Sequence, residues 1–345
     1  MQVRFKNRTA DGLLRQPAFM RYRDDKQPLD CLLPETGESL PEPAPVKEPR
    51  ERNVRLTNLE KVFWPAEGYT KGDLVTYYQQ VAEWLLPYLR DRPLVLTRYP
   101  DGIDGKSFFQ KDAPVYVPDW LRLETMWSEH AEREIRYFVV EDVEALTYVA
   151  NMAAIPLHIW SSRVSQLQHP DWCILDLDPK GAPFTDVIAI ARGLRRLCDD
   201  IGLPNYVKTS GSSGLHVLVP LGARYSYQQS RTLAELLARC IVKEMPELAT
   251  IRRAIDAREG KVYVDFLQNG HGRLLVAPFS VRPLAAAPIS MPLGWGQVNR
   301  RLKMSRFTIK TAGALLAKLK TDPLLGVMAD APDLAAALGR LSARL

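Results

Sequence analysis

Two aspartates in an Asp-Leu-Asp-Pro run are the first residues whose types and spacing indicate chemistry. Asp176 and Asp178 end the short apolar segment Cys173–Leu177, which is typical of a strand. Residues i and i+2 of a strand point to the same face, so both carboxylates would project together. Two such carboxylates repel each other unless a cation lies between them. The pattern favours a hard divalent ion such as Mg²⁺ or Mn²⁺, which prefers oxygen ligands and suits phosphate chemistry. The alternative is a turn or a helix cap, because Asp before Pro is common at turns.

A third carboxylate strengthens the metal interpretation. Asp265 is the lone acid in the apolar run Val262-Tyr263-Val264-Asp265-Phe266. A charged side chain in such a strand normally needs a partner. Three strand-borne acids would form a two-metal site, in which one ion activates an attacking hydroxyl and both stabilise a transferring phosphoryl group.

A loop rich in serine and glycine lies between the two acidic segments. It reads Lys208-Thr209-Ser210-Gly211-Ser212-Ser213-Gly214-Leu215-His216. Its backbone N–H groups and hydroxyls could cradle a triphosphate, with Lys208 and His216 at its two ends. It is not a Walker loop, because no G-x-x-x-x-G-K-[ST] run is present. A plain hairpin turn is the simpler alternative for this segment on its own.

The elements that must position these residues can be predicted from periodicity. Thr70 is a plausible N-cap of a helix whose apolar side chains recur from Leu74 to Leu86. Strands are predicted in 93–100, 133–141, 206–209, 216–220, 263–267 and 274–278, and helices in 143–152, 186–201 and 228–244. Helices are also expected in 315–319 and 334–341. Because no repeat is present, a mixed sheet architecture of α/β or α+β class is expected.

Composition and charge limit the class of protein. With 46% hydrophobic and 25% charged residues, the chain has an ordinary globular composition. No run of about 18 apolar residues could span a membrane, and the charged N-terminus lacks the apolar core of a secretory signal, so a cytoplasmic protein is expected. Cys31, Cys173, Cys198 and Cys240 form no C-x-x-C pair and are predicted to be reduced. The net charge of +6 favours a polyanionic partner.

The chain is expected to have three parts. Residues 1–26 contain strand-like segments, and residues 27–52 are dominated by Pro and Glu and are typical of a linker. The main domain is expected to comprise residues 53–345.

The motifs together resemble a known family. D-L-D-P, then K-T-S-G-S-S-G-L-H-V, then Y-V-D-F and A-P-F-S-V-R-P are similar to motifs of the archaeo-eukaryotic primase superfamily. The polymerase domain of bacterial DNA ligase D is the most similar member. Upstream, LTNLEKVFWPAEGYTKGDLVTYY and RYPDGIDGKSFFQKDAP resemble the opening motifs of that domain, so the resemblance extends over about residues 54–310. It implies a primase-type fold, with mixed sheets and flanking helices around a central cleft.

The resemblance also implies roles for individual residues. Asp176, Asp178 and Asp265 would be both catalytic residues and metal ligands, for two Mn²⁺ or Mg²⁺ ions. The residues that would contact the incoming nucleotide or its triphosphate are His158, Lys208, Ser210, His216, Arg258, Gln268 and Arg282. For His158, a satisfied core histidine is the alternative that its apolar surroundings favour.

A second set of residues would contact DNA. Lys61 and Lys71 match two lysines with which the family binds a 5′-phosphate at a gap or break. Phe108 and Phe109 lie between Lys106 and Lys111, which fits stacking on a base with phosphate contacts beside it. Core packing is the alternative for both rings, and one of the two is expected to be buried.

The N-terminal segment has a resemblance of its own. Residues 1–26 resemble the last strands of the ligase OB-fold, but the adenylated-lysine motif K-x-D-G is absent from the chain. The chain is therefore not expected to seal nicks.

The implied function is a DNA-end-directed nucleotidyltransferase. It would extend a primer 3′-hydroxyl with NTPs or dNTPs at gaps or double-strand breaks, during non-homologous end joining beside Ku and an ATP-dependent DNA ligase, at the nucleoid. A de novo primase is one alternative, although it would not need a grip on a 5′-phosphate. A DNA-end bridging module without catalysis is the other, which three intact acids disfavour.

Overall fold

The computed structural model describes the backbone of residues 2–4, 7–8, 14–15 and 18–21 and all of residues 52, 54–128 and 131–342. The chain divides into two compact units, Met1–Glu51 and Arg52–Leu345. In the first unit the described strands form two antiparallel pairs, β1 with β4 and β2 with β3. They are β1 (Gln2–Arg4), β2 (Asn7–Arg8), β3 (Leu14–Arg15) and β4 (Ala18–Arg21). The linker expected at 27–52 lies almost wholly outside the described residues, and the three-part division stays a prediction.

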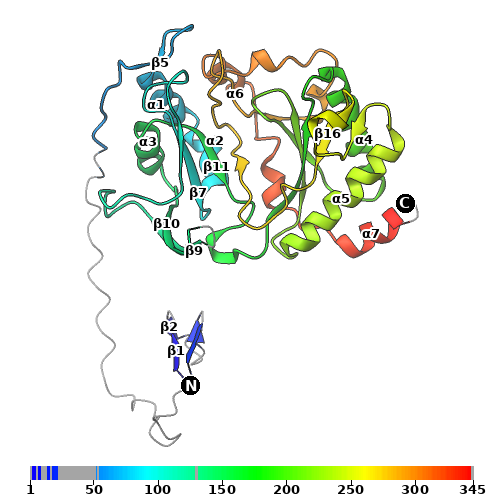
Figure 1. Ribbon diagram of the computed structural model, residues 1–345, viewed down its shortest axis with the longest axis horizontal. Helices are drawn as coiled ribbons and strands as arrows, with labels where there is room; N and C mark the ends of the chain where they lie inside the picture. The colour runs from blue at the N-terminus through cyan, green and yellow to red at the C-terminus, as the bar shows by residue number, and fades with distance from the viewer. Residues whose placement is uncertain are drawn as a thin grey trace, which may run out of the picture. The chain divides into compact units, whose positions relative to one another are not determined.

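The larger unit contains two mixed layers of sheet and helix, which lie side by side in Figure 1. The first sheet has the strand order β17-β11-β7-β10-β9, with β8 paired to the far end of β7. All of its described pairs are antiparallel. Its strands are β7 (Leu94–Arg98), β8 (Phe108–Gln110), β9 (Leu123–Ser128), β10 (Arg133–Phe138), β11 (Ala154–Ile159) and β17 (Leu275–Val276).

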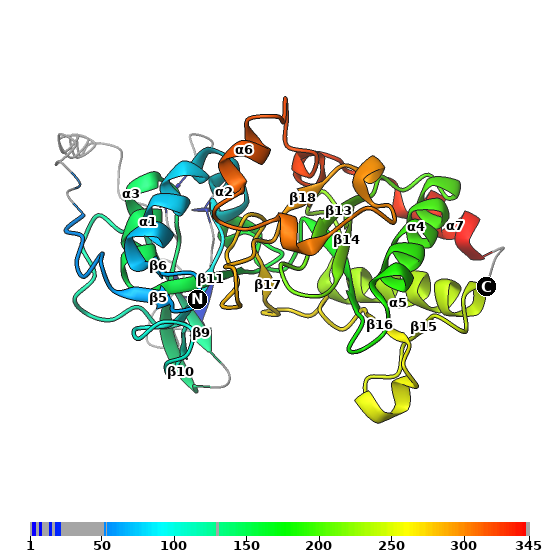
Figure 2. The same cartoon turned by 90° about the horizontal axis from the view of Figure 1, so that it is seen from above.

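The second sheet has the order β15-β16-β12-β14-β13-β18, and only β15 and β16 are parallel among its described pairs. Its strands are β12 (Trp172–Asp178), β13 (Tyr206–Thr209), β14 (Leu215–Pro220), β15 (Ala249–Thr250), β16 (Val262–Asp265) and β18 (Pro292–Leu293). The chain passes from β16 to β17 in the first sheet and returns to β18. This crossing ties the two sheets together next to the ends of β12 and β16 (Figure 2).

Helices cover each sheet. On the first sheet α1 (Lys71–Gln80), α2 (Ala82–Leu89) and α3 (Val143–Asn151) pack together, and on the second α4 (Phe184–Asp200) and α5 (Tyr227–Glu244) pack against β12 and β14. A short hairpin of β5 (Val62–Trp64) and β6 (Tyr69–Thr70) precedes α1. The remaining elements are the helices α6 (Ala312–Leu316) and α7 (Leu334–Ser342) and the 3₁₀ turns η2 (Val164–Gln166), η3 (Ile255–Arg258), η4 (Trp295–Gln297), η5 (Met304–Arg306) and η6 (Leu325–Met328).

Local sequence signals account for most of these boundaries. Thr70 accepts a hydrogen bond from the N–H of Asp73 while the Asp73 carboxylate accepts one from the N–H of Thr70, so the predicted N-cap of α1 is confirmed as a capping box. Ser226 caps α5 in the same way. The mixed α/β class is also confirmed. The buried core is continuous across both layers, and Cys173, Cys198 and Cys240 lie in it as free thiols.

Two element predictions need correction. The apolar spacing from Leu74 to Leu86 predicts one helix, but the helix ends at Val81, and a second helix with Pro87 inside it follows. The strand predicted over 263–267 ends at Asp265, because the carboxylate of Asp265 accepts a hydrogen bond from the Leu267 N–H and turns the chain. In the described part of the chain, no helix is long and apolar enough to cross a membrane.

Candidate active site

Four polar side chains occupy directly opposed positions on four adjacent strands of the second sheet. Register pairs Lys208 of β13 with His216 of β14, His216 with Asp176 of β12, and Asp176 with Asp265 of β16. Opposed residues share a face, so these four form a row across the sheet. We call it the cross-strand row. Sequence spacing predicts that Asp176 and Asp178 share a face, and the register adds Asp265 and His216 to it.

Three hydrogen bonds fix the carboxylate of Asp265. Its carboxylate accepts hydrogen bonds from the Leu267 N–H at 2.8 Å, the Tyr263 hydroxyl at 3.2 Å and the Gln268 amide at 3.3 Å. Burial raises the pKa of Asp265, and the neighbouring Asp176 charge raises it further, against the lowering effect of these hydrogen bonds. The carboxyl is thus fixed in place but electrostatically unfavourable as an anion.

Asp176 is perturbed in the opposite direction. Its Oδ1 lies 3.3 Å from Nε2 of His216, which is almost fully buried. Burial would raise the pKa of Asp176, but His216, Lys208 and Arg282 outweigh it and the pKa is lowered. Asp176 is therefore ionised beside a second carboxylate whose ionisation is suppressed. This arrangement is the one that a divalent cation would relieve.

Asp178 has a different partner. Its carboxylate accepts a hydrogen bond from Nη1 of Arg258 at 2.8 Å, while the same guanidinium donates to the Arg253 carbonyl and lies 4.4 Å from the Tyr263 ring centroid. Among the described residues, no group of three His, Cys, Asp or Glu side chains is gathered as a metal cluster. The donor chemistry still fits a hard cation, because Asp176 and Asp265 are directly opposed in the sheet and Asp178 lies two residues from Asp176 on the same strand.

Residues 210–214 form the Ser-Gly loop, and hydrogen bonds within the loop fix its conformation. The hydroxyl oxygen of Ser210 accepts hydrogen bonds from the N–H groups of Ser212 at 3.1 Å and Gly214 at 3.0 Å. A Cβ on Gly214 would lie 2.0 Å from the Leu177 carbonyl oxygen, and Gly211 has φ +73° with Arg282 in close contact. Only glycine fits both positions. The loop is thereby pressed against β12 at one end and against Arg282 at the other.

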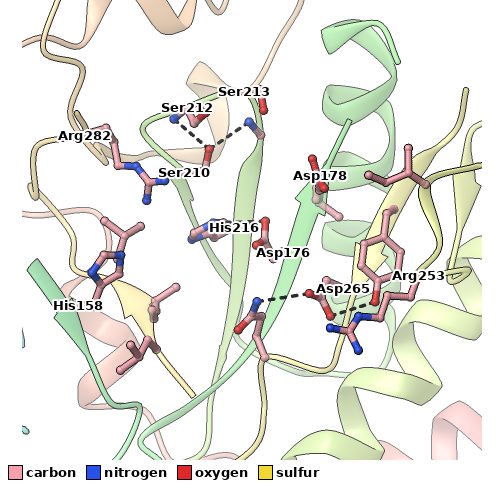
Figure 3. Close-up of a pocket in the computed structure, with 18 of the residues that line it drawn as sticks. His158, Asp176, Asp178, Ser210, Ser212, Ser213, His216, Arg253, Asp265 and Arg282 are labelled. Carbon is pink, nitrogen blue, oxygen red and sulfur yellow. Dashed lines mark hydrogen bonds and ion pairs between the residues drawn. The ribbon is translucent and has the colours of Figure 1, made fainter. Parts of the chain in front are cut away.

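A pocket of about 510 Å³ opens over the cross-strand row and this loop. Figure 3 shows Arg282 and His158 on one side, Asp178 and Arg253 on the other, and His216 and Asp176 between them. Three buried nitrogens of its lining residues have no hydrogen-bond partner among the described residues: Nδ1 of His158, Nδ1 of His216 and Nε of Arg282. Buried polar atoms are normally paired, so their lack of partners points to a polar occupant.

The structure places most of the predicted nucleotide residues at this pocket. His158, Ser210, His216, Arg258, Gln268 and Arg282 all line it. The core alternative for His158 is wrong, because its half-buried ring faces the pocket and lies 6.3 Å from the Phe109 ring, measured between centroids. Burial, together with Arg282 and Lys208, lowers the pKa of His158 to about 4, so the ring is neutral.

Lys208 is the exception. It is fully buried and is not among the residues that line the pocket. Its ammonium donates to the Ser290 hydroxyl at 2.7 Å, and Ser290 in turn donates to the Thr209 carbonyl. Lys208 therefore lies next to His216 in the cross-strand row but outside the lining of the pocket.

The predicted DNA-contacting lysines lie beside the first sheet. Lys61 is exposed and forms an ion pair with Asp101 at 2.6 Å. Lys71 is buried and donates to the Thr57 carbonyl at 2.6 Å. Burial lowers the pKa of Lys71, and the charges of Arg98 and Lys61 lower it further. The charges of the three cations thus act on one another, and we treat them as one cluster of positive charge.

The phenylalanine pair requires a correction. One of the two rings was expected in the core, but Phe108 is 45% exposed and Phe109 is 67% exposed. Strand β8 pairs only with β7 among the described strands, so nothing packs over its outer side. The Phe108 ring lies 5.3 Å from the Arg98 guanidinium, and Phe109 faces His158. The pair thus connects the cation cluster to the pocket.

Three residues of these sites are not predicted from the motifs. Arg98, at the end of β7, lies between Lys71 and Phe108. Tyr263 and Arg253 line the pocket. Tyr263 could have been found from its spacing, because it stands two residues before Asp265 on the same strand face. No local signal marks Arg98 or Arg253.

Comparison with known proteins agrees with this geometry. A family model for the primase-polymerase domain of LigD matches residues 70–324. The bifunctional non-homologous end joining protein LigD of Bacillus subtilis is 29% identical over 302 residues, which cover 87% of this chain and 47% of that protein. The multifunctional non-homologous end joining DNA repair protein LigD of Mycobacterium tuberculosis is 33% identical over 287 residues, which cover 79% of this chain and 38% of that protein. The chain thus spans less than half the length of these relatives.

One solved structure is similar over its entire length. The polymerase domain from Mycobacterium tuberculosis ligase D in complex with DNA superposes with a TM-score of 0.75 and 31% sequence identity. The match covers 82% of this chain and all of that one. The resemblance inferred from the motifs, and with it the primase-type fold, is therefore confirmed.

Proposed function

Since the chain belongs to the LigD primase-polymerase domain family, we propose that it is a metal-dependent nucleotidyltransferase that extends a primer 3′-hydroxyl at a DNA gap or break. The reaction is in-line attack of the hydroxyl on the α-phosphate of a nucleoside triphosphate, with pyrophosphate as the leaving group. The activity, substrates and partners of the full-length relatives are part of this proposal.

The observation that carries the proposal is the juxtaposition of two acids with a phosphate-sized basic wall. Asp176 and Asp265 stand opposite each other in the sheet, and the Ser-Gly loop and Arg282, whose Nε is unpartnered, line the same pocket. Acidic and basic groups in one cleft match a cation that is bound together with a polyphosphate.

Asp176, Asp265 and Asp178 are the side chains that would hold two divalent ions, Mn²⁺ or Mg²⁺. When bound, such ions lower the pKa of the attacking hydroxyl and stabilise the charge of the phosphoryl group in transfer. Arg258 contacts one of the two oxygens of Asp178, so release of the guanidinium would free both oxygens for an ion. Arg258 belongs to η3, which is joined to β16 by a glycine with φ +74° at Gly260, so a short loop carries it.

The opposite wall would bind the nucleotide. The Ser210 hydroxyl has used its oxygen as an acceptor within the loop and keeps its proton free to donate to a phosphate oxygen. Arg282 supplies a further donor through its Nε. Gln268 and His158 line the side of the pocket toward β17, where the nucleoside would lie. A neutral His158 can accept a hydrogen bond there as well as donate one.

The first sheet would bind the DNA end. Lys61, Lys71 and Arg98 form a cluster for a 5′-phosphate, and Phe108 and Phe109 offer exposed rings for stacking on a base between that cluster and the pocket. The names of the relatives place them in non-homologous end joining. By analogy, we expect this chain to act in double-strand break repair with Ku and an ATP-dependent DNA ligase.

Primer extension on a gapped duplex tests the proposal. The assay would use a downstream 5′-phosphate, Mn²⁺ or Mg²⁺, and ribo- or deoxyribonucleotides in parallel, with Asp176→Ala as the inactive control. Metal-dependent extension that Asp176→Ala loses would support it. Tight binding without extension in any of these mixtures would mean that the chain bridges DNA ends, and synthesis without a primer would mean that it is a primase.

A further inference from the structure

The positive charge of the chain is concentrated in one segment. Residues 266–321 contain nine Lys and Arg and no Asp or Glu, whereas the whole chain has 46 basic and 40 acidic residues. All the acids therefore lie outside this segment, and the rest of the chain is net acidic. The excess positive charge that favours a polyanionic partner therefore lies in residues 266–321.

Five of these cations follow β18 within eleven residues. Arg300, Arg301, Lys303, Arg306 and Lys310 are all exposed. In the region the structure describes, none of the five side chains forms a hydrogen bond or an ion pair. Some exposed arginines of the unit, Arg133, Arg239 and Arg196 among them, are paired with acids. Unpaired like charges repel one another, so such a group persists at a cost that a polyanion would remove.

A groove lies beside this group. Its volume is about 700 Å³, and it runs between α4 and the start of the basic segment. Arg192 and Arg196 of α4 face Arg300 and Asn299 across it, with Asp186 as the one acid of its lining. Arg192 donates to the Val298 carbonyl at 3.3 Å, which joins the helix to the segment. We call Arg192, Arg196, Asn299 and Arg300, together with Arg301 and Lys303, the α4 basic face.

The same segment extends to the active site. Met304, Ser305 and Thr308 line a separate pocket of about 380 Å³ whose other wall includes Gly211 and Ser212 of the Ser-Gly loop. At its other end, the groove reaches Thr185 and Asp186, at the start of α4 and shortly after Asp178. A chain of phosphates along this face would therefore lead to the catalytic pocket.

The composition of the groove indicates the form of the nucleic acid. Its lining residues are Thr, Asp, Ile, Ala, Arg, Met and Asn, without an aromatic ring. Single strands are usually held by stacking on aromatic side chains, whereas a duplex is held through its phosphates by Arg and Lys. The exposed Phe108 and Phe109 are on the first sheet, with the predicted 5′-phosphate cluster. The two basic sites are thus on different layers of the unit, because α1 and β5 lie beside the first sheet and α4 beside the second (Figure 2).

From this placement we propose that the α4 basic face binds the phosphate backbone of the upstream, primer-bearing duplex, while the first sheet binds the downstream end. The proposal deepens the polymerase function and rests on it for the identity of the strand. Binding through this face needs neither nucleotide nor metal, so it is separable from catalysis. It predicts affinity that depends on the length of the upstream arm and not on its sequence.

The test is equilibrium binding to gapped duplexes without nucleotide or metal. The downstream arm and its 5′-phosphate are kept constant, and the upstream arm is shorter than one helical turn or longer than two. The variant is Arg300→Ala with Arg301→Ala and Lys303→Ala, whose side chains make no bond that the folded unit needs. The matched control removes three charges at Arg231, Lys318 and Lys320, which are exposed and line neither the groove nor the pocket beside the Ser-Gly loop.

For the long arm, we expect the variant to bind roughly tenfold more weakly than the control, and its salt slope to fall by about two to three. For the short arm, the two should bind alike. Equal loss on both arms would place the contact downstream and overturn the proposal, as would no loss on either. The binding test is independent of the primer-extension assay. An unmodified protein that binds the long arm through this face but shows no extension in that assay would refute the polymerase assignment alone. A thermal unfolding curve equal to that of the control confirms that the variant is folded.

Discussion

On the second sheet, the polar groups are buried or half-buried, opposed by register and already paired, whereas on the first sheet Lys61, Phe108 and Phe109 are exposed. His216 contacts Asp176, and Asp265 accepts three hydrogen bonds. Phe108 and Phe109 project from an outer strand, and Lys61 has only an exposed acid as a partner. Groups that act on a bond must be held in one geometry, while groups that meet a DNA end must remain accessible to it. Each prediction below tests whether this division holds.

The largest effect is expected from the cross-strand row. Asp265→Asn keeps the shape of the side chain but removes a charge that would hold a cation, which is worth several kcal/mol of transition-state stabilisation. Extension should fall by roughly 10³-fold or more, while affinity for a 5′-phosphorylated gap is retained. Steady-state rates and binding on the same DNA measure both. A parallel loss of binding would show that the two sheets are not divided in this way.

Backbone fit at the Ser-Gly loop gives the next effect. Gly214→Ala would place a Cβ 2.0 Å from the Leu177 carbonyl oxygen, so the loop or the start of β14 must shift. We expect a loss of roughly 1–3 kcal/mol in the free energy of unfolding, with a larger loss of nucleotide affinity. Gly296→Ala is the control, since a Cβ there meets nothing within 4 Å. Equal behaviour of the two variants in denaturant unfolding would contradict the close contact.

The first sheet should behave in the opposite way. Phe109→Ala removes an exposed ring, so stability should be unchanged, but affinity for a gapped duplex should fall by roughly 1–3 kcal/mol if the ring stacks on a base. Trp127→Ala is a matched control, because Trp127 is 65% exposed on β9, away from the pocket lining. Similar DNA affinity of Phe109→Ala and the unmodified protein would rule out stacking.

His158 lies between the two regions, and its titration gives a pH-dependent test. Its pKa is about 4 in the folded chain and near 6.5 when unfolded, so the unfolded state binds more protons between these values. Its stabilising contribution is therefore complete above pH 6.5 and falls as the pH drops toward 4. At pH 5 the penalty is about 2 kcal/mol, which His158→Gln should lack. If unfolding experiments at pH 7 and pH 5 give the same difference between the two proteins, burial does not hold the ring neutral.

The smallest effect concerns the 5′-phosphate cluster. Asp101→Asn frees Lys61 from its exposed ion pair, which is itself worth at most about 1 kcal/mol. Affinity for a gap with a 5′-phosphate should rise by up to a few fold, and affinity for the same gap without it should not change. Lys61→Ala should lower the affinity for the gap with a 5′-phosphate and leave the affinity for the gap without it unchanged. A rise on both DNAs would indicate general attraction and no specific phosphate site.

The sequence predicts the local part of this account well and the long-range part poorly. The capping box at Thr70, the helices α4 and α5 and strand β13 follow from short-range signals. The cross-strand row depends on the register between β12, β14 and β16, which lie far apart in the chain, so spacing alone finds only Asp176 and Asp178.

Exposure is the other quantity that local signals miss. The sequence around Phe108 and Phe109 does not indicate that β8 pairs with no described strand other than β7. The sequence around Lys208 likewise does not indicate that this side chain is fully buried. The placement of Arg98 between Lys71 and Phe108 likewise results from the pairing of β7 with β8. Packing between segments distant in sequence decides all three, and periodicity within one segment cannot report it.

One measurement tests the central claim, that both sheets act on the same gapped DNA, most directly. It compares primer extension on a single gapped duplex with and without a 5′-phosphate downstream of the gap, for the unmodified protein and for Lys61→Ala. Extension by the unmodified protein should be faster with the phosphate, and Lys61→Ala should lose most of that advantage while keeping the rate on the unphosphorylated gap. Equal rates on both DNAs for the unmodified protein would contradict the account.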